Sequence, residues 1–574
     1  MKHIRTYLPV TWRASSTTGP ACARPTPIAW TWGAVAVAFV LVNAGKLTLF
    51  RQLLTEHTMS PTSLLAHGAE AAACLLAVYW LILLAGRRCL LLVFYAVQLL
   101  YLFANLQYFQ FFGSYLYLGE IRKLLPSVFS ILSVGAYHFD RESVVFLADL
   151  PLLLVLTARK WPRWQELRAA RAIRISAVVV ALALSACWGW GVLDSSGSAS
   201  DLDVKEAEQH CVREHGLLAF TMHDYFAGNR AYRHNLLQVS HPVVRFPPGR
   251  PLRSIYLIQV EAMDARVVGL KYEGQEVMPF LSELRHESIY YPFTLSYHSG
   301  GGTSDCDFTV LNSVEPSRRA SVFFDEHYDY PNALTKVLRG SGYGVYAFHG
   351  NVIKSWARHL AYPRMGYSEF FDIAKMGLSE QGWGAPDGAV FDFATQFTAT
   401  CKAPFFAHII TMSSHYPYKN AEYYHHSAME NYSASPLAAR YLNCMNYVDG
   451  CLRKLVTELR RRDDGYIILL GDHTPPRVQS DALRASKLQV GGAVLEFVPL
   501  FILGPGLEPR QETRFVAGFL DVAPTILSLS GVPCTYATSG IDLSAPPALP
   551  PPIHNDHKAY SRQELFELCR SRLP

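Results

Sequence analysis

Five apolar stretches before residue 195 constrain the fold of this 574-residue chain more than any other feature. They cover residues 28–50, 63–86, 89–112, 143–158 and 175–193, of which 143–158 is short and contains Asp149. The other four are long enough to cross a bilayer core of about 30 Å. Successive stretches with almost no charge are typical of membrane helices rather than of buried core helices. We therefore expect a membrane domain of about five transmembrane helices over residues 1–193.

Basic residues predict the orientation of this domain. They gather before the first stretch, between the second and third, and before the fifth: Lys2, Arg5, Arg13, Arg24, Arg87, Arg88, Arg159, Lys160, Arg163, Arg168, Arg171 and Arg174. These are alternate loops, so the positive-inside rule places the N-terminus in the cytoplasm and everything after Leu193 outside. The formal net charge of +5 mostly reflects this pattern and does not indicate a nucleic-acid partner. The sequence predicts a multi-pass protein of the cell membrane.

After a polar linker at 194–250, strand and helix patterns alternate in the chain. Apolar strand candidates are 254–260, 343–348, 405–411, 466–470 and 498–503, and helical periodicity occurs at 278–287, 331–339, 438–461 and 521–531. This alternation predicts an α/β sandwich with helices on both faces of a sheet. We expect it to occupy residues 251–545, followed by a C-terminal tail at 546–574, and the Pro-rich stretch at 545–552 is typical of a surface tail.

Metal-ligand side chains stand at the ends of these strands. Glu261 closes the first strand, Asp472 and His473 close the fourth, and Thr303 follows a glycine run. Because the carboxyl ends of strands meet at one edge of an α/β sheet, we expect these groups to share a site. A divalent cation there would lower the pKa of a coordinated hydroxyl. Thr303 by itself also fits a helix N-cap, but the whole set predicts a metal-activated transferase or hydrolase.

Several sequence strings resemble one known family. They are Gln259-Val-Glu-Ala, Gly301-Gly-Thr-Ser-Asp-Cys-Asp-Phe, Phe348-His-Gly-Asn, Ser414-His-Tyr-Pro-Tyr and Gly471-Asp-His. These resemble the lipoteichoic acid synthase and phosphoglycerol transferase family, part of the alkaline phosphatase and sulfatase superfamily. The resemblance implies a sulfatase-like α/β sandwich preceded by a membrane domain. It also implies one divalent ion, most often Mn²⁺ with Mg²⁺ or Zn²⁺ as alternatives, held by Glu261, Thr303, Asp472 and His473.

The same resemblance implies that Thr303 is the nucleophile and that the phosphoglycerol pocket is lined by His349, Trp356, Arg358 and His415. An arginine fork suits a phosphodiester. From the residues alone, other interpretations stay open: Trp356 as a core residue, Arg358 paired with an acid, and His415 in a turn. Gly302 and Asn351 depart from the family, which tends to have a lysine and an acid there, so the acceptor side is expected to differ.

The implied reaction transfers phosphoglycerol from phosphatidylglycerol to a hydroxyl of a glycan or polyglycerolphosphate-type polymer through a phospho-threonine intermediate. A phosphoethanolamine transferase is the nearest alternative, although such enzymes usually show Gly-Glu-Thr-Ala at the first strand. A non-catalytic membrane scaffold would be expected to have a broken ligand set. A sulfatase activity is excluded because Val314 occupies the place of the nucleophile before Glu315-Pro-Ser-Arg. The cysteines outside the membrane and the departures favour a periplasmic location.

Overall fold

The computed structural model describes residues 38–51, 88–112, 115–116, 146–158, 212, 217, 220 and 241–572, the last with gaps at 249, 273, 298–300, 318–320, 424–435, 463–464, 477, 479–485, 491–492 and 556–557. The chain divides into two compact units. One comprises Met1–Thr48, Ser60–Tyr95 and Arg141–Leu184, and the other comprises Leu49–Met59, Ala96–Asp140 and Ser185–Pro574.

Apolar helices occur at three of the five predicted stretches. Residues 38–51 are helical, α3 spans Arg88–Phe112 and α5 spans Leu150–Ala158. Within the described residues, one segment, Leu92–Phe109 of α3, is long and apolar enough to cross a membrane. The stretches 63–86 and 175–193 lie outside the described residues, so the prediction of five spans stays a prediction.

Asp149, the acid inside the fourth apolar stretch, is fully paired. Lys46 Nζ lies 2.6 Å from its Oδ2, and Tyr95 donates its hydroxyl to Oδ1 over 2.7 Å. Asn43 also donates to Oδ2. These partners come from residues 38–51 and from α3. The buried Asp149 carboxylate therefore links its own segment to two others within the first unit. Pairing of this kind is what makes an ionisable group tolerable in an apolar environment.

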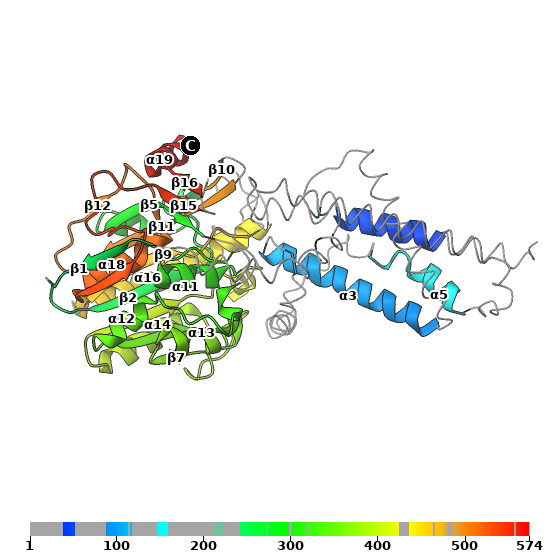
Figure 1. The fold of residues 1–574 in the computed structure, drawn as a ribbon, viewed down its shortest axis with the longest axis horizontal. Helices are drawn as coiled ribbons and strands as arrows, with labels where there is room; N and C mark the ends of the chain where they lie inside the picture. Colours follow the sequence, from blue (N-terminus) through cyan, green and yellow to red (C-terminus); the bar gives the residue numbers. More distant parts are fainter. Residues whose placement is uncertain are drawn as a thin grey trace, which may run out of the picture. The chain divides into compact units, whose positions relative to one another are not determined.

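A ten-stranded sheet organises the second unit (Figure 1). Its main path runs β12 (Arg510–Gln511), β5 (Ile289–Ser296), β11 (Ala493–Leu503), β9 (Gly465–Gly471), β2 (Ser254–Val260), β8 (Phe405–Ile410), β6 (Gly344–His349) and β7 (Glu369–Phe371), with β10 (Lys487–Val490) on β11 and β13 (Ala517–Gly518) on β5. Strands β9, β2, β8, β6 and β7 are parallel, whereas β11 is antiparallel to both β9 and β5. The five predicted strands are confirmed, whereas β5, the longest of the others, and the short strands β7, β10, β12 and β13 were not predicted.

Helices cover both faces of this sheet, which confirms the predicted α/β sandwich. Alternate residues of β2 point to opposite sides, so Leu257 joins one buried cluster and Ile258 the other. The first cluster includes α11 (Thr303–Asn312), α12 (Leu334–Gly340), α13 (Arg358–Met365), α18 (Val522–Ser530) and α19 (Arg562–Ser571). The second includes α10 (Pro279–Leu284), α14 (Asp387–Thr400) and α16 (Pro436–Arg462).

The ends of the α/β domain differ from the sequence expectation. Part of the expected linker forms β1 (Val243–Phe246), which pairs with β14 (Cys534–Ala537). The expected tail contains the hairpin β15 (Ile553–Asn555) and β16 (Lys558–Tyr560), and then α19. Leu565 and Phe566 of α19 enter the core, and Arg562 forms a buried ion pair with Asp521 over 2.7 Å. The prediction of a surface tail is therefore wrong for this part.

Short elements complete the described chain. They are the hairpin β3 (Lys271–Tyr272) and β4 (Gln275–Glu276), and the 3-10 helices η6 (Val322–Phe324), η7 (Ser355–Ala357), η8 (Lys419–Tyr423) and η9 (Phe519–Asp521).

Candidate active site

The carboxyl ends of the parallel strands gather the predicted site residues at one edge of the sheet. Glu261 follows β2, Asp472 and His473 follow β9, and His349 ends β6. The turn after β8 carries His415. Strand β5 runs in the same direction as β9, since both are antiparallel to β11, and the chain after it enters α11 at Thr303. The predicted site residues therefore lie at one edge of the sheet, as the ends of the strands indicated.

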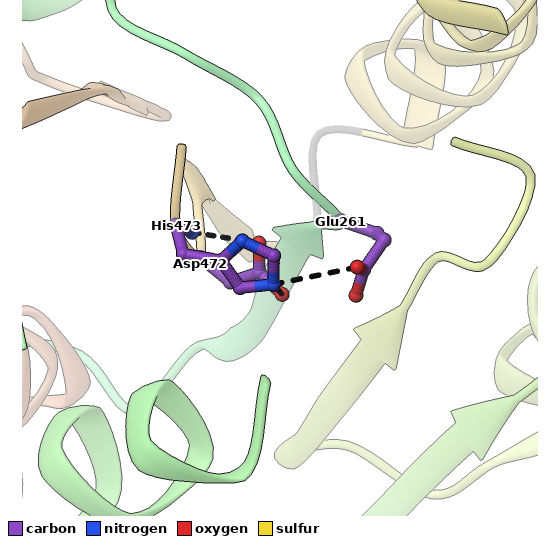
Figure 2. A group of neighbouring side chains, drawn as sticks. All are labelled: Glu261, Asp472 and His473. Atoms are coloured by element: carbon purple, nitrogen blue, oxygen red, sulfur yellow. Dashed lines mark hydrogen bonds and ion pairs between the residues drawn. The ribbon is translucent and has the colours of Figure 1, made fainter. Parts of the chain in front are cut away.

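Glu261, Asp472 and His473 form a buried cluster in which one potential ligand atom of each lies within 4.8 Å of the others. Figure 2 shows the His473 ring directed towards the Glu261 carboxylate; its Nε2 lies 3.4 Å from Glu261 Oε1 and 3.7 Å from Asp472 Oδ2. Thr303 Oγ1 donates to Glu261 Oε2 over 2.8 Å. The structure therefore brings the four predicted metal ligands together.

The donor atoms of this cluster fit a divalent cation. His473 Nδ1 lies 2.9 Å from the Thr474 carbonyl, which fixes a proton there and leaves Nε2 to hold either a second proton or a cation. Asp472 Oδ1 accepts from the Ala262 and His473 backbone N–H groups, each over 2.7 Å. Asp472 Oδ2 is buried and receives no hydrogen bond from the described residues. An unsatisfied buried carboxylate oxygen is costly, and coordination would satisfy it.

The charges of the cluster also favour a bound cation. Burial, with the Glu261 charge added, raises the pKa of Asp472 well above its usual range. Burial opposes a charge on His473, but Asp472 and Glu261 overcome that effect and raise its pKa to about 10. Burial also disfavours the Glu261 carboxylate, yet His415 and His473 hold its pKa below the usual range. Two buried carboxylates thus require a positive partner, either a proton or a cation.

Thr303 is the first residue of α11, and its hydroxyl is not used as a helix cap. The N-cap position belongs to Gly302, whose φ of 50° is one that glycine adopts at little cost. A Cβ on Gly301 would collide with the Asp305 carboxylate, which accepts from the Gly301 N–H over 2.9 Å. The glycine run therefore lets the chain turn tightly and present the Thr303 side chain to Glu261.

The turn after β8 fixes Glu261 and places His415 beside it. The Glu261 N–H donates to Thr411 Oγ1 over 2.8 Å, and Ser414 Oγ donates to the Glu261 carbonyl over 2.6 Å. His415 Nε2 lies 3.9 Å from Glu261 Oε1, and its side chain is 22% exposed. The Trp383 ring packs against the His415 ring with a centroid separation of 4.2 Å. His415 thus lies at the open side of the cluster.

The other three predicted pocket residues have defined positions. His349 Nδ1 donates to the Ile410 carbonyl over 3.1 Å, and burial together with the Arg358 charge lowers its pKa to about 3, so the ring is neutral. Arg358 is buried, and its Nε lies 2.9 Å from Asp307 Oδ2, as in the ion-pair interpretation. Its Nη2 is buried without a hydrogen-bond partner among the described residues.

The Trp356 ring lies 3.5 Å from where a Cβ on Gly302 would be, next to Thr303. Trp356 and Ala357 both have a φ of 54°. Adjacent non-glycine residues in the left-handed region store strain that is often found at functional sites.

Sequence reasoning missed a second group of polar residues beneath the cluster. Gln259 and His408 are buried inside β2 and β8, and Asp307 is buried on α11. The available signal was a polar side chain within an otherwise apolar strand, because such a group must find hydrogen-bond partners when the strand is buried.

Comparisons with known proteins agree with this geometry. The family model described as Sulfatase matches residues 253–532. These residues form a sulfatase-family domain. Members of this superfamily use divalent metal ions, in keeping with the Glu261, Asp472 and His473 cluster.

The chain is similar to Lipoteichoic acid synthase 2 of Bacillus subtilis, with 25% identity over 476 residues, 77% of this chain and 72% of the relative. Its match to Lipoteichoic acid synthase of Staphylococcus aureus is 26% identical over 310 residues, 51% of this chain and 47% of the relative, so this chain spans about half of that protein. Among solved structures, the integral membrane protein lipooligosaccharide phosphoethanolamine transferase A (EptA) from Neisseria meningitidis matches with a TM-score of 0.56 and 15% identity, covering 87% of this chain and 96% of that chain. At this identity the likeness supports the fold alone.

Proposed function

We propose that this protein is a membrane-bound, metal-dependent phosphoglycerol transferase of the sulfatase-like superfamily. It moves phosphoglycerol from phosphatidylglycerol to a hydroxyl of a glycan or of a polyglycerolphosphate-type polymer. The observation that carries the proposal is the Thr303 hydroxyl, 2.8 Å from Glu261 Oε2, beside Asp472 and His473 and at the N-terminus of α11. The similarity to proteins named lipoteichoic acid synthase supports the choice of phosphoglycerol.

Glu261, Thr303, Asp472 and His473 would hold one divalent ion, for which Mn²⁺ is our first choice and Mg²⁺ or Zn²⁺ the alternatives. When bound, the ion would lower the pKa of the Thr303 hydroxyl and neutralise charge that develops on the phosphate. Glu261 accepts the hydrogen bond of that hydroxyl, so it orients Thr303 Oγ for attack. The N-terminus of α11 adds the positive end of the helix dipole where a phosphate would lie.

The reaction proceeds in two displacements. In the first, Thr303 loses its proton and forms a bond to phosphorus, while the bond from phosphorus to the diacylglycerol oxygen breaks and that oxygen gains a proton. In the second, an acceptor hydroxyl loses its proton and bonds to phosphorus, and Thr303 regains its hydroxyl. The transferred group is phosphoglycerol in both steps, so the phosphodiester count is unchanged.

Four side chains are assigned to the pocket for this group. Arg358 has a buried Nη2 free to donate to a phosphate oxygen, and neutral His349 keeps its Nε2 for the headgroup. Trp356 offers an apolar ring for the glycerol carbons, and His415 lies at the exposed rim. We propose a multi-pass inner-membrane protein with a periplasmic catalytic domain, because anchoring in the membrane would bring that domain to its lipid donor.

Intact-mass analysis of the purified chain after incubation with phosphatidylglycerol tests the proposal. We expect a phosphoglycerol adduct in wild type and none in Thr303→Ala. Ser304→Ala is the matched control, because Ser304 is the next hydroxyl on α11 but donates to the Gly301 carbonyl over 2.7 Å instead of to Glu261. An adduct in Thr303→Ala would refute the assigned nucleophile.

The same measurement separates the rival functions. Phosphatidylethanolamine supplied in a parallel sample would give a phosphoethanolamine adduct if the chain were a phosphoethanolamine transferase. A chain that forms no adduct with either lipid, with Mn²⁺ present, would be the non-catalytic scaffold.

A further inference from the structure

A buried hydrogen-bond network lies directly beneath Thr303. Gln259 Nε2 donates to the Thr303 carbonyl over 3.2 Å and to Asp307 Oδ1 over 2.8 Å. Both acceptors belong to the first turns of α11, and Gln259 belongs to β2 and is fully buried. One amide group on the sheet therefore fixes the start of the helix that carries Thr303.

The orientation of Gln259 is itself fixed from the neighbouring strand. Its Oε1 lies 3.2 Å from His408 Nε2, and His408 Nδ1 lies 2.9 Å from the Tyr367 hydroxyl. Because the Gln259 amide nitrogen uses its protons on α11, its oxygen must accept from His408 Nε2–H. Burial lowers the pKa of His408 to about 4, so the ring is neutral and its Nδ1 accepts from Tyr367. Each donated proton in this path therefore has one acceptor.

Asp307 extends the network to the predicted phosphate pocket. Its Oδ2 accepts from Arg358 Nε over 2.9 Å and from the Tyr362 hydroxyl over 2.8 Å. Arg358 is the first residue of α13. Asp307 thus joins the helix of Thr303 to the helix of Arg358.

Two groups of Thr303, its hydroxyl and its carbonyl, are hydrogen-bonded by residues that lie two positions apart in one chain segment. Its hydroxyl donates to Glu261, and its carbonyl accepts from Gln259. Residues at i and i+2 of an extended segment lie on the same face, so the end of β2 aligns both anchors with Thr303. A residue that only filled the core would not need an amide at this position, whereas Gln259 satisfies the buried Asp307 Oδ1 and His408 Nε2–H.

We propose that Gln259 is a positioning residue that sets Thr303 for metal binding and attack, and that Asp307 is a positioning residue that sets Arg358. This inference rests on the proposed function for its kinetic part. Its metal-binding part does not, because Thr303 Oγ is a predicted ligand whether or not a lipid is bound.

The test compares Gln259→Met with Ile258→Val in the full-length chain. Methionine keeps the volume but cannot donate, and Ile258 is a buried neighbour on the opposite face of β2. For Gln259→Met we expect an about tenfold weaker Mn²⁺ affinity by isothermal titration and an about tenfold slower single-turnover modification of Thr303, with the donor KM unchanged. For Asp307→Asn we expect the opposite pattern: the donor KM rises, and the single-turnover rate changes less than in Gln259→Met. Ile258→Val should match wild type in every readout except melting temperature.

The proposal is overturned if Gln259→Met equals Ile258→Val in both Mn²⁺ affinity and single-turnover rate. If Gln259→Met does not fold, His408→Phe replaces it, because it removes the donor that orients Gln259 and should shift both readouts in the same direction. A wild type that binds Mn²⁺ but forms no adduct would refute the proposed function alone, and the comparison of Mn²⁺ affinities would still decide the role of Gln259.

Discussion

Arg358 Nε lies 2.9 Å from Asp307 Oδ2 in a pair whose side chains are 1% and 0% exposed. Asp307 raises the pKa of Arg358 further despite the opposing effect of burial, so the guanidinium stays charged. The pair leaves Nη2 of Arg358 free for an anion. A structural ion pair and a phosphate site therefore share one guanidinium, and the two interpretations of Arg358 that the sequence left open are compatible.

Arg358→Lys should separate these two roles. Lysine keeps the charge but has one point donor in place of the fork, so it cannot serve Asp307 and a phosphate at once. We expect the donor KM to rise about tenfold, with folding retained because the buried carboxylate keeps a cation. Vesicle assays with phosphatidylglycerol measure KM, and thermal melting measures folding. Arg364→Lys, on the same helix and partly exposed, is the control. An unchanged KM would remove Arg358 from the pocket.

Asp472→Asn should lower metal affinity without lowering the stability of the metal-free protein. Asparagine keeps an oxygen for the Ala262 and His473 N–H groups, and it removes a carboxylate that burial and Glu261 disfavour. We expect Mn²⁺ affinity to fall about a hundredfold, within the range for loss of a charged ligand contact. Elemental analysis of the purified chain and melting curves in chelator provide the measurements. A metal-free variant that melts well below wild type would contradict the electrostatic argument.

The site at the edge of the sheet could be predicted from the sequence because the strands leading to it are short apolar runs that end in charged groups. Strand β5 escaped prediction because Pro292 interrupts it and proline is disfavoured inside strands. The structure resolves the conflict with an irregular register: β11 shifts between Val498 and Leu500, and Thr294 and Tyr291 of β5 lie opposite those residues. Pro292 and Pro499 thus fall at the same break, where a ladder hydrogen bond is already absent.

Partners distant in sequence were beyond prediction. Asp307 and Arg358 are 51 positions apart, and Gln259 and His408 are 149 apart, so no local pattern links them. The four proposed metal ligands could be picked out because each follows a strand or a glycine run, which are local signals. The supporting residues lie within elements, where only the fold decides which polar side chains meet.

The stability of the α/β domain should fall as pH rises from about 4 to about 6, and Asp449 should account for part of this change. Asp449 accepts from the Phe280 and Leu281 N–H groups over 2.8 and 2.9 Å, and burial raises its pKa to about 6. Between the unfolded value of 3.8 and 6 the folded state binds the extra proton, so the contribution of Asp449 to stability decreases with pH there and is constant above. We expect Asp449→Asn to show a smaller drop in melting temperature between these pH values. Glu326→Gln, at an exposed site, should behave as wild type. An identical pH dependence in Asp449→Asn would exclude this carboxylate as a source.

Lys46 and Asp149 allow a double-mutant test of the first unit. Each side chain is almost fully buried, and Nζ lies 2.6 Å from Oδ2. Removing one partner leaves an uncompensated charge, which costs about 3–5 kcal/mol when a pair is buried. We therefore expect Lys46→Met and Asp149→Asn each to lower the melting temperature strongly in detergent. The double variant should be more stable than either single one, because both charges are gone while Tyr95 and Asn43 can still bond the amide that replaces the carboxylate.

Val97→Ala, an exposed apolar position on α3, provides the control for handling in detergent. Additive losses in the double variant would show that the two charges do not interact in the folded protein.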